Sequence, residues 1–117
     1  MEAFSVGVEE RDGCAILHLH GYFDGAAGQA LEAELDRQLR GGRVRIVFDF
    51  APCQVVSSPG VASMVELAVK VCDDFQGRLV LCGLDALKLK VFTLAGILDM
   101  CAAAPGVAEA VAQATAA

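Results

Sequence analysis

Two adjacent serines, Ser57 and Ser58, offer hydroxyl groups where the sequence predicts that a buried strand leads into a long helix. We expect Ser58 to cap that helix, with Pro59 at the first helical position, where the missing N–H of proline is no loss. A helix N-terminus gathers unpaired N–H groups and the positive end of the helix dipole, so it stabilises negative charge. A phosphate on Ser58 would therefore lie in a favourable field and would add about −1.5 to −2 charges. The plainer alternative is that Ser58 only caps the helix.

Three further side chains could take part in polar chemistry. Asp24 follows a predicted strand and could cap the next helix, or make a polar contact near Ser58 if both loops share one edge of a sheet. His18 and His20 alternate on one face of a strand, a spacing that can bind a metal. No third ligand is evident, so we expect a solvated or hydrogen-bonded pair and no metal site.

The motifs of common catalytic sites are missing from the sequence. Nucleophilic catalysis by serine needs a base and an oxyanion site, and the chain has no G-x-S-x-G turn. It also has no glycine-rich phosphate loop. We therefore predict a protein that is not an enzyme, with no catalytic residue and no cofactor.

Composition limits the class of protein. The 117 residues are 56% hydrophobic and 21% charged, which predicts a folded chain with room for one domain, residues 1–117. The net charge of −6 argues against nucleic acid and anionic lipid as partners, because both require basic patches. The longest uncharged stretch, Phe50 to Val65, is too short and interrupted to insert in a membrane.

The cysteines and the first residues indicate where the protein works. The five cysteines are odd in number and lack C-x-x-C spacing, so the sequence predicts neither a disulfide framework nor a zinc site. Glu2 stands where a secretory signal would carry a basic residue. We expect a cytoplasmic protein.

Hydrophobic periodicity predicts an α/β fold with a mixed sheet. The predicted strands are Phe4–Val8, Cys14–His20, Val44–Phe50, Leu79–Cys82 and, at an edge, Ile97–Met100. The predicted helices follow Asp24, follow Ser58, run from Asp85 to Phe92, and cover Val107–Ala116. The first two strands are joined by a short turn at Arg11-Asp12-Gly13 and should form an antiparallel hairpin. This order predicts one sheet of about five strands with about four helices packed on it.

The helix after Ser58 is apolar nearly all round. Its expected core stripe consists of Val61, Met64, Val65, Ala68, Cys72 and Phe75. Leu67, Val69 and Val71 are apolar in addition, so this helix is either buried on several sides, under Leu87 and Val91, or presents a docking face. The sequence leaves open whether such a face supports a homodimer.

Four segments together resemble the STAS domain, the fold shared by bacterial anti-sigma factor antagonists and the cytoplasmic tails of sulfate transporters. They are Gly21-x-Phe23-Asp24, Ile46-Val47-Phe48-Asp49-Phe50, Ser57-Ser58-Pro59-Gly60-Val61 and Val91-Phe92-Thr93-Leu94-Ala95-Gly96-Ile97. They occur in the order and spacing of the family and cover almost the whole chain.

The resemblance implies a regulatory binding module. In this family, a serine at the start of the second helix is phosphorylated by a partner that is both anti-sigma factor and serine kinase. The unmodified antagonist captures that partner, and phosphorylation releases it. Ser58 matches the acceptor position and Asp24 the neighbouring loop aspartate, while Ser57 replaces a frequent aspartate and Pro59 a small residue. The resemblance implies partner binding by Asp24, Ser57, Ser58, Pro59, Gly60 and Val61.

Four hypotheses about function follow. The first is an anti-sigma factor antagonist, switched at Ser58 by a GHKL-type ATPase kinase. The second is an accessory STAS subunit of a transport or signalling assembly, without a phosphorylation switch. The third is a domain that binds a small anionic ligand or nucleotide between the loops of Asp24 and Ser58. The fourth is an enzyme that uses Ser58 or a cysteine.

Overall fold

The sheet has six strands in the computed structural model, which describes residues 2–116. Met1 and Ala117, the ends of the expected domain, lie outside the described residues. The strands are β1 (Ser5–Arg11), β2 (Cys14–Phe23), β3 (Arg45–Asp49), β4 (Cys53–Val56), β5 (Arg78–Cys82) and β6 (Ala102–Ala104). The main order is β1-β2-β3-β5-β6, and β4 pairs with the end of β2. Among residues 2–116, the β1–β2 pair is antiparallel and the other strand pairs are parallel.

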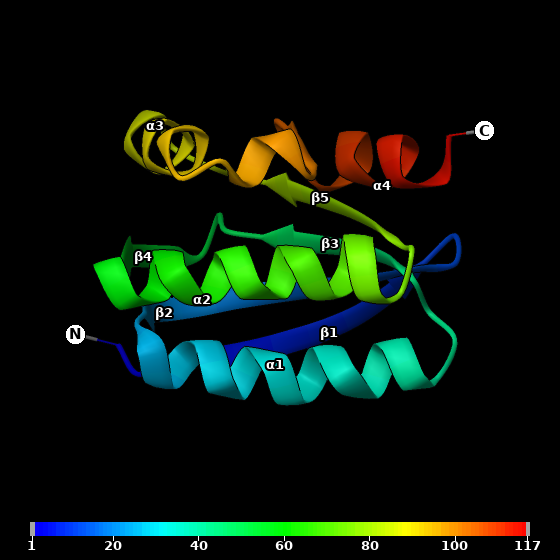
Figure 1. Ribbon diagram of the computed structural model, residues 1–117, viewed down its shortest axis with the longest axis horizontal. Helices are drawn as coiled ribbons and strands as arrows, with labels where there is room; N and C mark the ends of the chain where they lie inside the picture. The colour runs from blue at the N-terminus through cyan, green and yellow to red at the C-terminus, as the bar shows by residue number, and fades with distance from the viewer. Residues whose placement is uncertain (1, 117) are drawn as a thin grey trace.

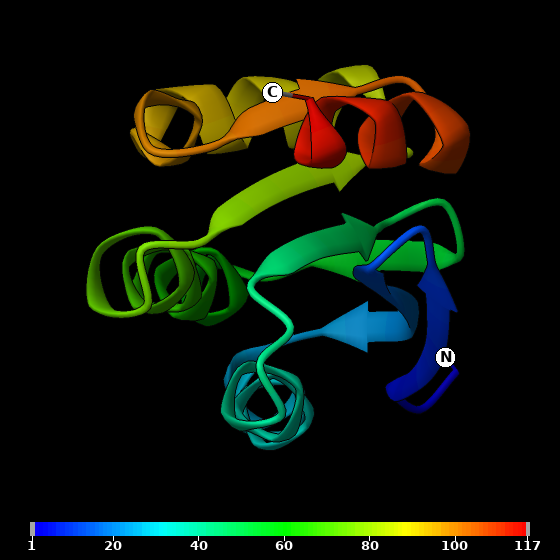
Figure 2. The same ribbon diagram turned by 90° about the vertical axis from the view of Figure 1, so that its right-hand side faces the viewer.

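Helices cover both faces of this sheet. They are α1 (Gly25–Arg40), α2 (Ser58–Val69), α3 (Ala86–Leu94) and α4 (Val107–Thr115), with a π-helical turn η1 (Lys70–Asp74) and a 3₁₀ turn η2 (Ile97–Asp99). In Figure 1, α1 and α2 run side by side across one face. Figure 2 shows them on the opposite side of β3 and β5 from α4. This arrangement confirms the expected mixed α/β fold.

Alternation along the strands builds two apolar layers. Leu17 and Phe48 point toward α1 and α2 and belong to the larger core, whereas Ile16 and Val47 point toward α4 and belong to the smaller one. A strand that is buried on both faces reads as a continuous apolar run, which explains the pattern of residues 46–48. Among the described residues, no helix has both the length and the apolar character needed to cross a membrane.

One predicted strand was wrong, and two short strands were not predicted. Ile97–Met100 is not a strand: Gly96, at φ 82°, ends α3, and η2 buries Ile97 in the core. The edge strand is instead β6, whose three alanines have no strand signature in the sequence. β4 was missed because it is only four residues long and follows Pro52.

The structure shows how α2 is buried. Leu67 and Val71 are 2% and 0% exposed, so they form core and not a docking face. The reason is that α2 packs against α1 as well as the sheet, which widens its buried face. Leu87 does not cover it, being 71% exposed, and Phe75, expected in the core, is exposed where the helix ends.

Candidate functional site at the start of α1 and α2

The ends of β2 and β4 bring the two candidate loops together. Phe23 and Val56 are partners in the parallel β2–β4 ladder, and the N–H of Ser57 donates to the carbonyl of Phe23 at 2.9 Å. The next residues, Asp24 and Ser57, cap α1 and α2. The two helices therefore start side by side, as the left-hand end of Figure 1 shows.

Glycine permits this close approach. A Cβ on Gly60 would lie 2.3 Å from the carbonyl oxygen of Phe23, and one on Gly28 would lie 2.3 Å from Oγ of Ser63. A Cβ on Gly25 would meet the Cβ of Pro59 at 3.6 Å, an ordinary contact. Gly60 is thus a packing requirement that holds the first turn of α2 against the end of β2.

The cap of α2 is Ser57 and not Ser58, contrary to the prediction. Oγ of Ser57 accepts a hydrogen bond from the N–H of Gly60 at 3.2 Å, and Pro59 stands at the second helical position. The cap must have an extended backbone, and Ser57 has one because its N–H continues the β2–β4 pairing. Ser58 is consequently the first helical residue and is exposed to solvent.

Asp24 caps α1, as the sequence indicates. Its Oδ1 accepts the N–H of Ala27 at 2.8 Å, so one carboxylate oxygen is committed to the helix. The groove between α1 and α2, about 380 Å³, is lined by two carboxylates, Glu32 and Glu66, and by no Lys or Arg of residues 2–116. This lining does not favour the anionic ligand of the third hypothesis.

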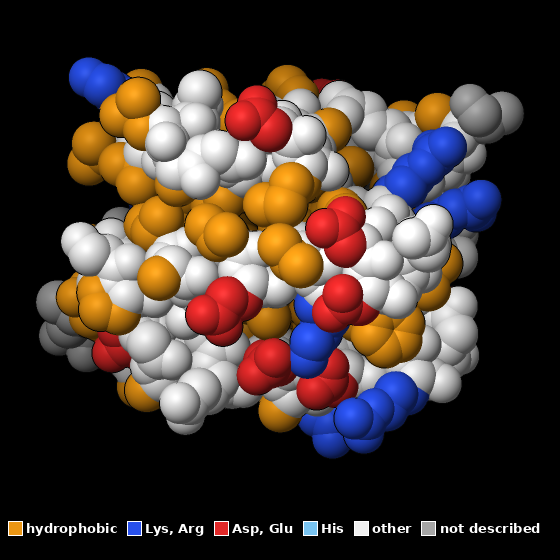
Figure 3. Space-filling view, in the orientation of Figure 1, with side chains coloured by type: hydrophobic (Ala, Val, Ile, Leu, Met, Phe, Trp, Pro, Cys, Tyr) orange, Lys and Arg blue, Asp and Glu red, His pale blue; other side chains and the backbone are white. Residues whose placement is uncertain are grey.

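An apolar surface adjoins the two serines on the side of α3. A cleft of about 150 Å³ between β4 and α3 is lined by Val55, Val56, Leu87 and Val91, which we call the β4–α3 surface. Val55 and Leu87 are 47% and 71% exposed. On the face seen in Figure 3, which α2 covers in front of β4, further hydrophobic side chains gather between α2 and the helical segments above it. Apolar groups collected in this way are typical of protein-binding surfaces.

A buried lysine holds this surface in place. The side chain of Lys88 is only 10% exposed, and its Nζ donates to Oδ2 of Asp85 at 2.7 Å and to the carbonyl of Gln54 at 3.4 Å. Asp85 also caps α3 through the N–H of Lys88, as predicted. The hydrogen bonds with Lys88 lower the pKa of the Asp85 carboxyl. Lys88 thereby fastens α3 to β4.

The ring of His18 lies between two carboxylates. Nδ1 of His18 lies 2.7 Å from Oδ2 of Asp49 and its Nε2 lies 3.0 Å from Oε1 of Glu9, which confirms the expectation of a hydrogen-bonded side chain. Within residues 2–116, no three His, Cys, Asp or Glu side chains are grouped so that they could hold a metal ion.

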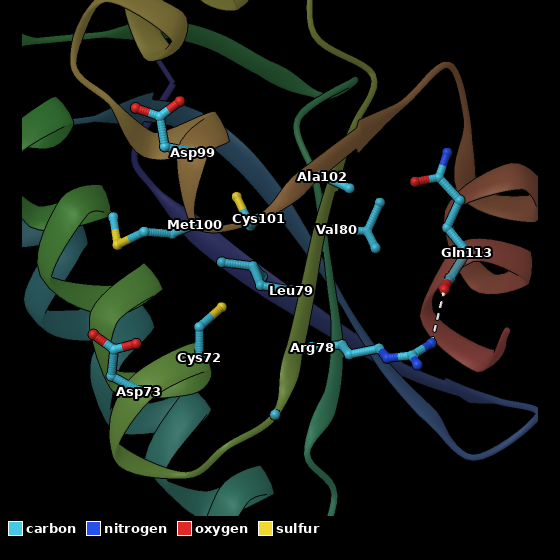
Figure 4. A pocket seen from close by; sticks show the side chains of 11 residues that line it. Cys72, Asp73, Arg78, Leu79, Val80, Asp99, Met100, Cys101, Ala102 and Gln113 are labelled. Atoms are coloured by element: carbon cyan, nitrogen blue, oxygen red, sulfur yellow. Dashed lines mark hydrogen bonds between the residues drawn. The ribbon is translucent and has the colours of Figure 1, made fainter. Parts of the chain in front are cut away.

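A further cavity lies at the other end of α2. Figure 4 shows the side chains that line its volume of about 590 Å³, among them Cys72, Cys101 and Arg78. Burial raises the pKa of the Cys72 thiol, and it raises that of Cys101 to about 12. Thiols with raised pKa values are poor nucleophiles, so this cavity does not support the hypothesis of a cysteine enzyme.

A family model for the STAS domain matches residues 5–114. The chain belongs to the STAS domain family. Among curated proteins it is 36% identical over 93 residues to BtrV of Bordetella bronchiseptica, assigned as an anti-sigma factor antagonist, covering 80% of this chain and 79% of that protein. The chain is therefore an STAS domain similar to the anti-sigma factor antagonists.

Solved structures share the fold at low sequence identity. An anti-sigma factor antagonist from Mycobacterium paratuberculosis is 17% identical with a TM-score of 0.81, over 96% of this chain and 94% of that one. Unphosphorylated SpoIIAA, also an anti-sigma factor antagonist, is 19% identical with a TM-score of 0.70, over 95% and 96%. At these identities the likeness establishes the fold of this STAS domain and leaves its partner to other arguments.

The sequence missed the β4–α3 surface of this STAS domain. β4 was not predicted, so Val55 and Val56 were not placed beside α3. The sequence carries a signal for the α3 side of this surface only. Lys88 follows Asp85 by three residues, a spacing typical of a capped helix with an ion pair in its first turn.

Proposed function

We propose that this protein is an anti-sigma factor antagonist that binds an anti-sigma factor with serine kinase activity of the GHKL ATPase type. Phosphorylation of Ser58 by that partner ends the complex. Membership of the STAS family and the similarity to BtrV support the first part of this proposal. The position of Ser58, matching the acceptor serine, supports the second.

The main support for this proposal is that the two serines have different structural roles. Ser57 caps α2, so the hydroxyl of Ser58 is exposed and not needed to hold the helix. A phosphate there would be tolerated by the helix N-terminus, because unpaired N–H groups favour negative charge. It would nevertheless place about two charges beside the apolar β4–α3 surface, where desolvation opposes docking.

The proposed partner-binding residues fall into two groups, those that solvent can reach and one that is buried. Ser58 and Pro59 are exposed, and Asp24, Ser57 and Val61 are half-buried, so these five offer atoms to a partner. Gly60 is buried and acts by allowing the close approach of α2 to β2. The binding surface then consists of these five residues and the β4–α3 surface.

The test is capture of the partner from native lysate with tagged wild-type protein and with Ser58→Asp, followed by intact-mass analysis. We expect the wild type to recover a GHKL-type ATPase and Ser58→Asp to recover at least about tenfold less. The purified ATPase with ATP should then add one phosphate to the wild type and to Ser57→Ala, but none to Ser58→Ala. Recovery of membrane transport components by both proteins, with no phosphate on Ser58, would favour the accessory-subunit hypothesis instead.

A further inference from the structure

One imidazole joins three strands on the face of the sheet that carries α4. His18 of β2 contacts Glu9 of β1 through Nε2 at 3.0 Å and Asp49 of β3 through Nδ1 at 2.7 Å. Neutral histidine has one N–H, and only the protonated ring has two. Both contacts are therefore full hydrogen bonds only when His18 is protonated.

Asp49 connects this imidazole to the turn that leads to the proposed switch. Its other oxygen, Oδ1, accepts the N–H of Ala51 at 3.0 Å. Asp49 is the last residue of β3 and is 8% exposed, so its carboxylate is held between the ring and the turn. The turn at residues 50–52 leads directly into β4, and Ser57 is the first residue after β4.

We propose that His18 is a positioning residue whose protonation holds Asp49 against the N–H of Ala51, which makes the turn ahead of β4 sensitive to pH. Loss of the proton leaves Asp49 and Glu9 facing a ring with a single N–H. The contact to one carboxylate is then replaced by repulsion between its oxygens and the ring lone pair. If the hydrogen bond between Asp49 and His18 is the one that is lost, the carboxylate of Asp49 can rotate toward solvent. Its hydrogen bond with the N–H of Ala51 then weakens.

The surrounding charges favour the protonated ring. Glu9 faces His18 from β1 and is itself bound by Arg11, while Asp49 faces it from β3. From β5, Sγ of Cys82 lies 3.8 Å from Oδ1 of Asp49, and from α4 the carboxylate of Glu109 acts on that thiol. On β2 itself, His20 shares the face of His18, and both flank Gly7.

The sign of the effect follows from the pKa of His18. Burial alone lowers this pKa, but the hydrogen bonds to Glu9 and Asp49 outweigh burial and raise it above the ordinary 6.5. A group with a raised pKa contributes stability that is complete below its unfolded pKa and is lost as pH rises through the folded value. The turn should therefore be tightest at mildly acidic pH.

The test follows the His18 ring and the Ala51 amide by NMR from about pH 5.5 to about pH 8.5. We expect one midpoint for both signals, above 6.5. In His18→Gln the pH dependence of the Ala51 amide should be lost, while the control His20→Gln should retain it. If His18→Gln does not fold, Glu9→Gln replaces it, because it keeps the ring and Asp49 and should lower the shared midpoint.

Either of two results would overturn the proposal: an Ala51 amide that stays constant while His18 titrates, or one that still titrates in His18→Gln. The consequence for partner binding rests on the proposed function. If that function is right, affinity for the captured ATPase should weaken above the midpoint in the wild type and not in His18→Gln. If no ATPase is captured, the Ala51 result still decides the role of His18.

Discussion

The backbone N–H of Ser57 donates to the carbonyl of Phe23 at 2.9 Å, and this bond fixes the start of α2 beside the start of α1. Phe23 immediately precedes Asp24, the cap of α1. This hydrogen bond continues the β2–β4 ladder, and together they place both helix caps at one edge of the sheet. The site depends on this junction, and its parts can be tested separately.

Ser57 and Ser58 should differ sharply in their effect on stability. Ser57→Ala removes the cap of α2 and should lower the free energy of unfolding by about 1 kcal/mol. Ser58→Ala removes an exposed hydroxyl and should change it by less than about 0.5 kcal/mol. Urea denaturation of both variants measures the difference. The reverse order would show that Ser58 is the cap in solution.

Gly60 should not tolerate a side chain. In Gly60→Ala the new Cβ would lie 2.3 Å from the carbonyl oxygen of Phe23, which cannot move without loss of its bond to Ser57. We expect a loss of about 1–3 kcal/mol in unfolding free energy, from thermal or urea unfolding. Gly7→Ala is the control, since its Cβ would meet that of His18 at 3.8 Å, an ordinary contact. Equal stability of the two variants would contradict the close approach.

Replacing Asp85 should lower the free energy of unfolding more than replacing its buried partner, Lys88. Asp85→Ala leaves the ammonium of Lys88 buried without a carboxylate and removes the cap of α3, so we expect a loss of about 2 kcal/mol. The exposure of Asp85 keeps this loss below that of a fully buried pair. Lys88→Met fills the same space without charge and should cost less than about 1 kcal/mol. Urea denaturation compares the two, and a larger loss in Lys88→Met would show that the lysine contacts dominate.

Arg78 should stabilise the end of α4. Its guanidinium donates to the carbonyls of Gln113 at 3.4 Å and Ala114 at 3.5 Å, and also to that of Ala116. These carbonyls lie at the C-terminal end of α4, which is the negative end of the helix dipole. In Arg78→Ala, amides of α4 should exchange with deuterium about two- to fivefold faster. Arg37→Ala, which breaks an exposed pair on α1, should leave exchange in α4 unchanged.

The β4–α3 surface should contribute to partner affinity. Leu87→Asp should weaken binding of the captured ATPase at least about tenfold, because it places a charge on an apolar contact. Its side chain is 71% exposed, so the stability of the free protein should be nearly unchanged. Leu94→Asp, 78% exposed on the same helix and outside the cleft, is the matched control for affinity. Equal affinities of the two variants would remove this surface from the proposed interface.

The sequence was sufficient where a local signal and the tertiary structure agree. The buried runs of β3 and β5, the leucines of α1 and the caps Asp24 and Asp85 all have such signals. The sequence could not show which serine caps α2, because two adjacent serines are locally equivalent. The hydrogen bond from the N–H of Ser57 to β2 decides between them. The His18 contacts depend on register across three strands, which no local pattern specifies.

The two outer strands of the sheet bear on how the protein behaves at high concentration. β6 is only three residues long and is followed by Pro105, while β1 carries three consecutive charged residues, Glu9, Glu10 and Arg11. Short or charged outer strands oppose pairing between the sheets of separate molecules. Outer strands of this kind therefore oppose aggregation of the protein when it is concentrated.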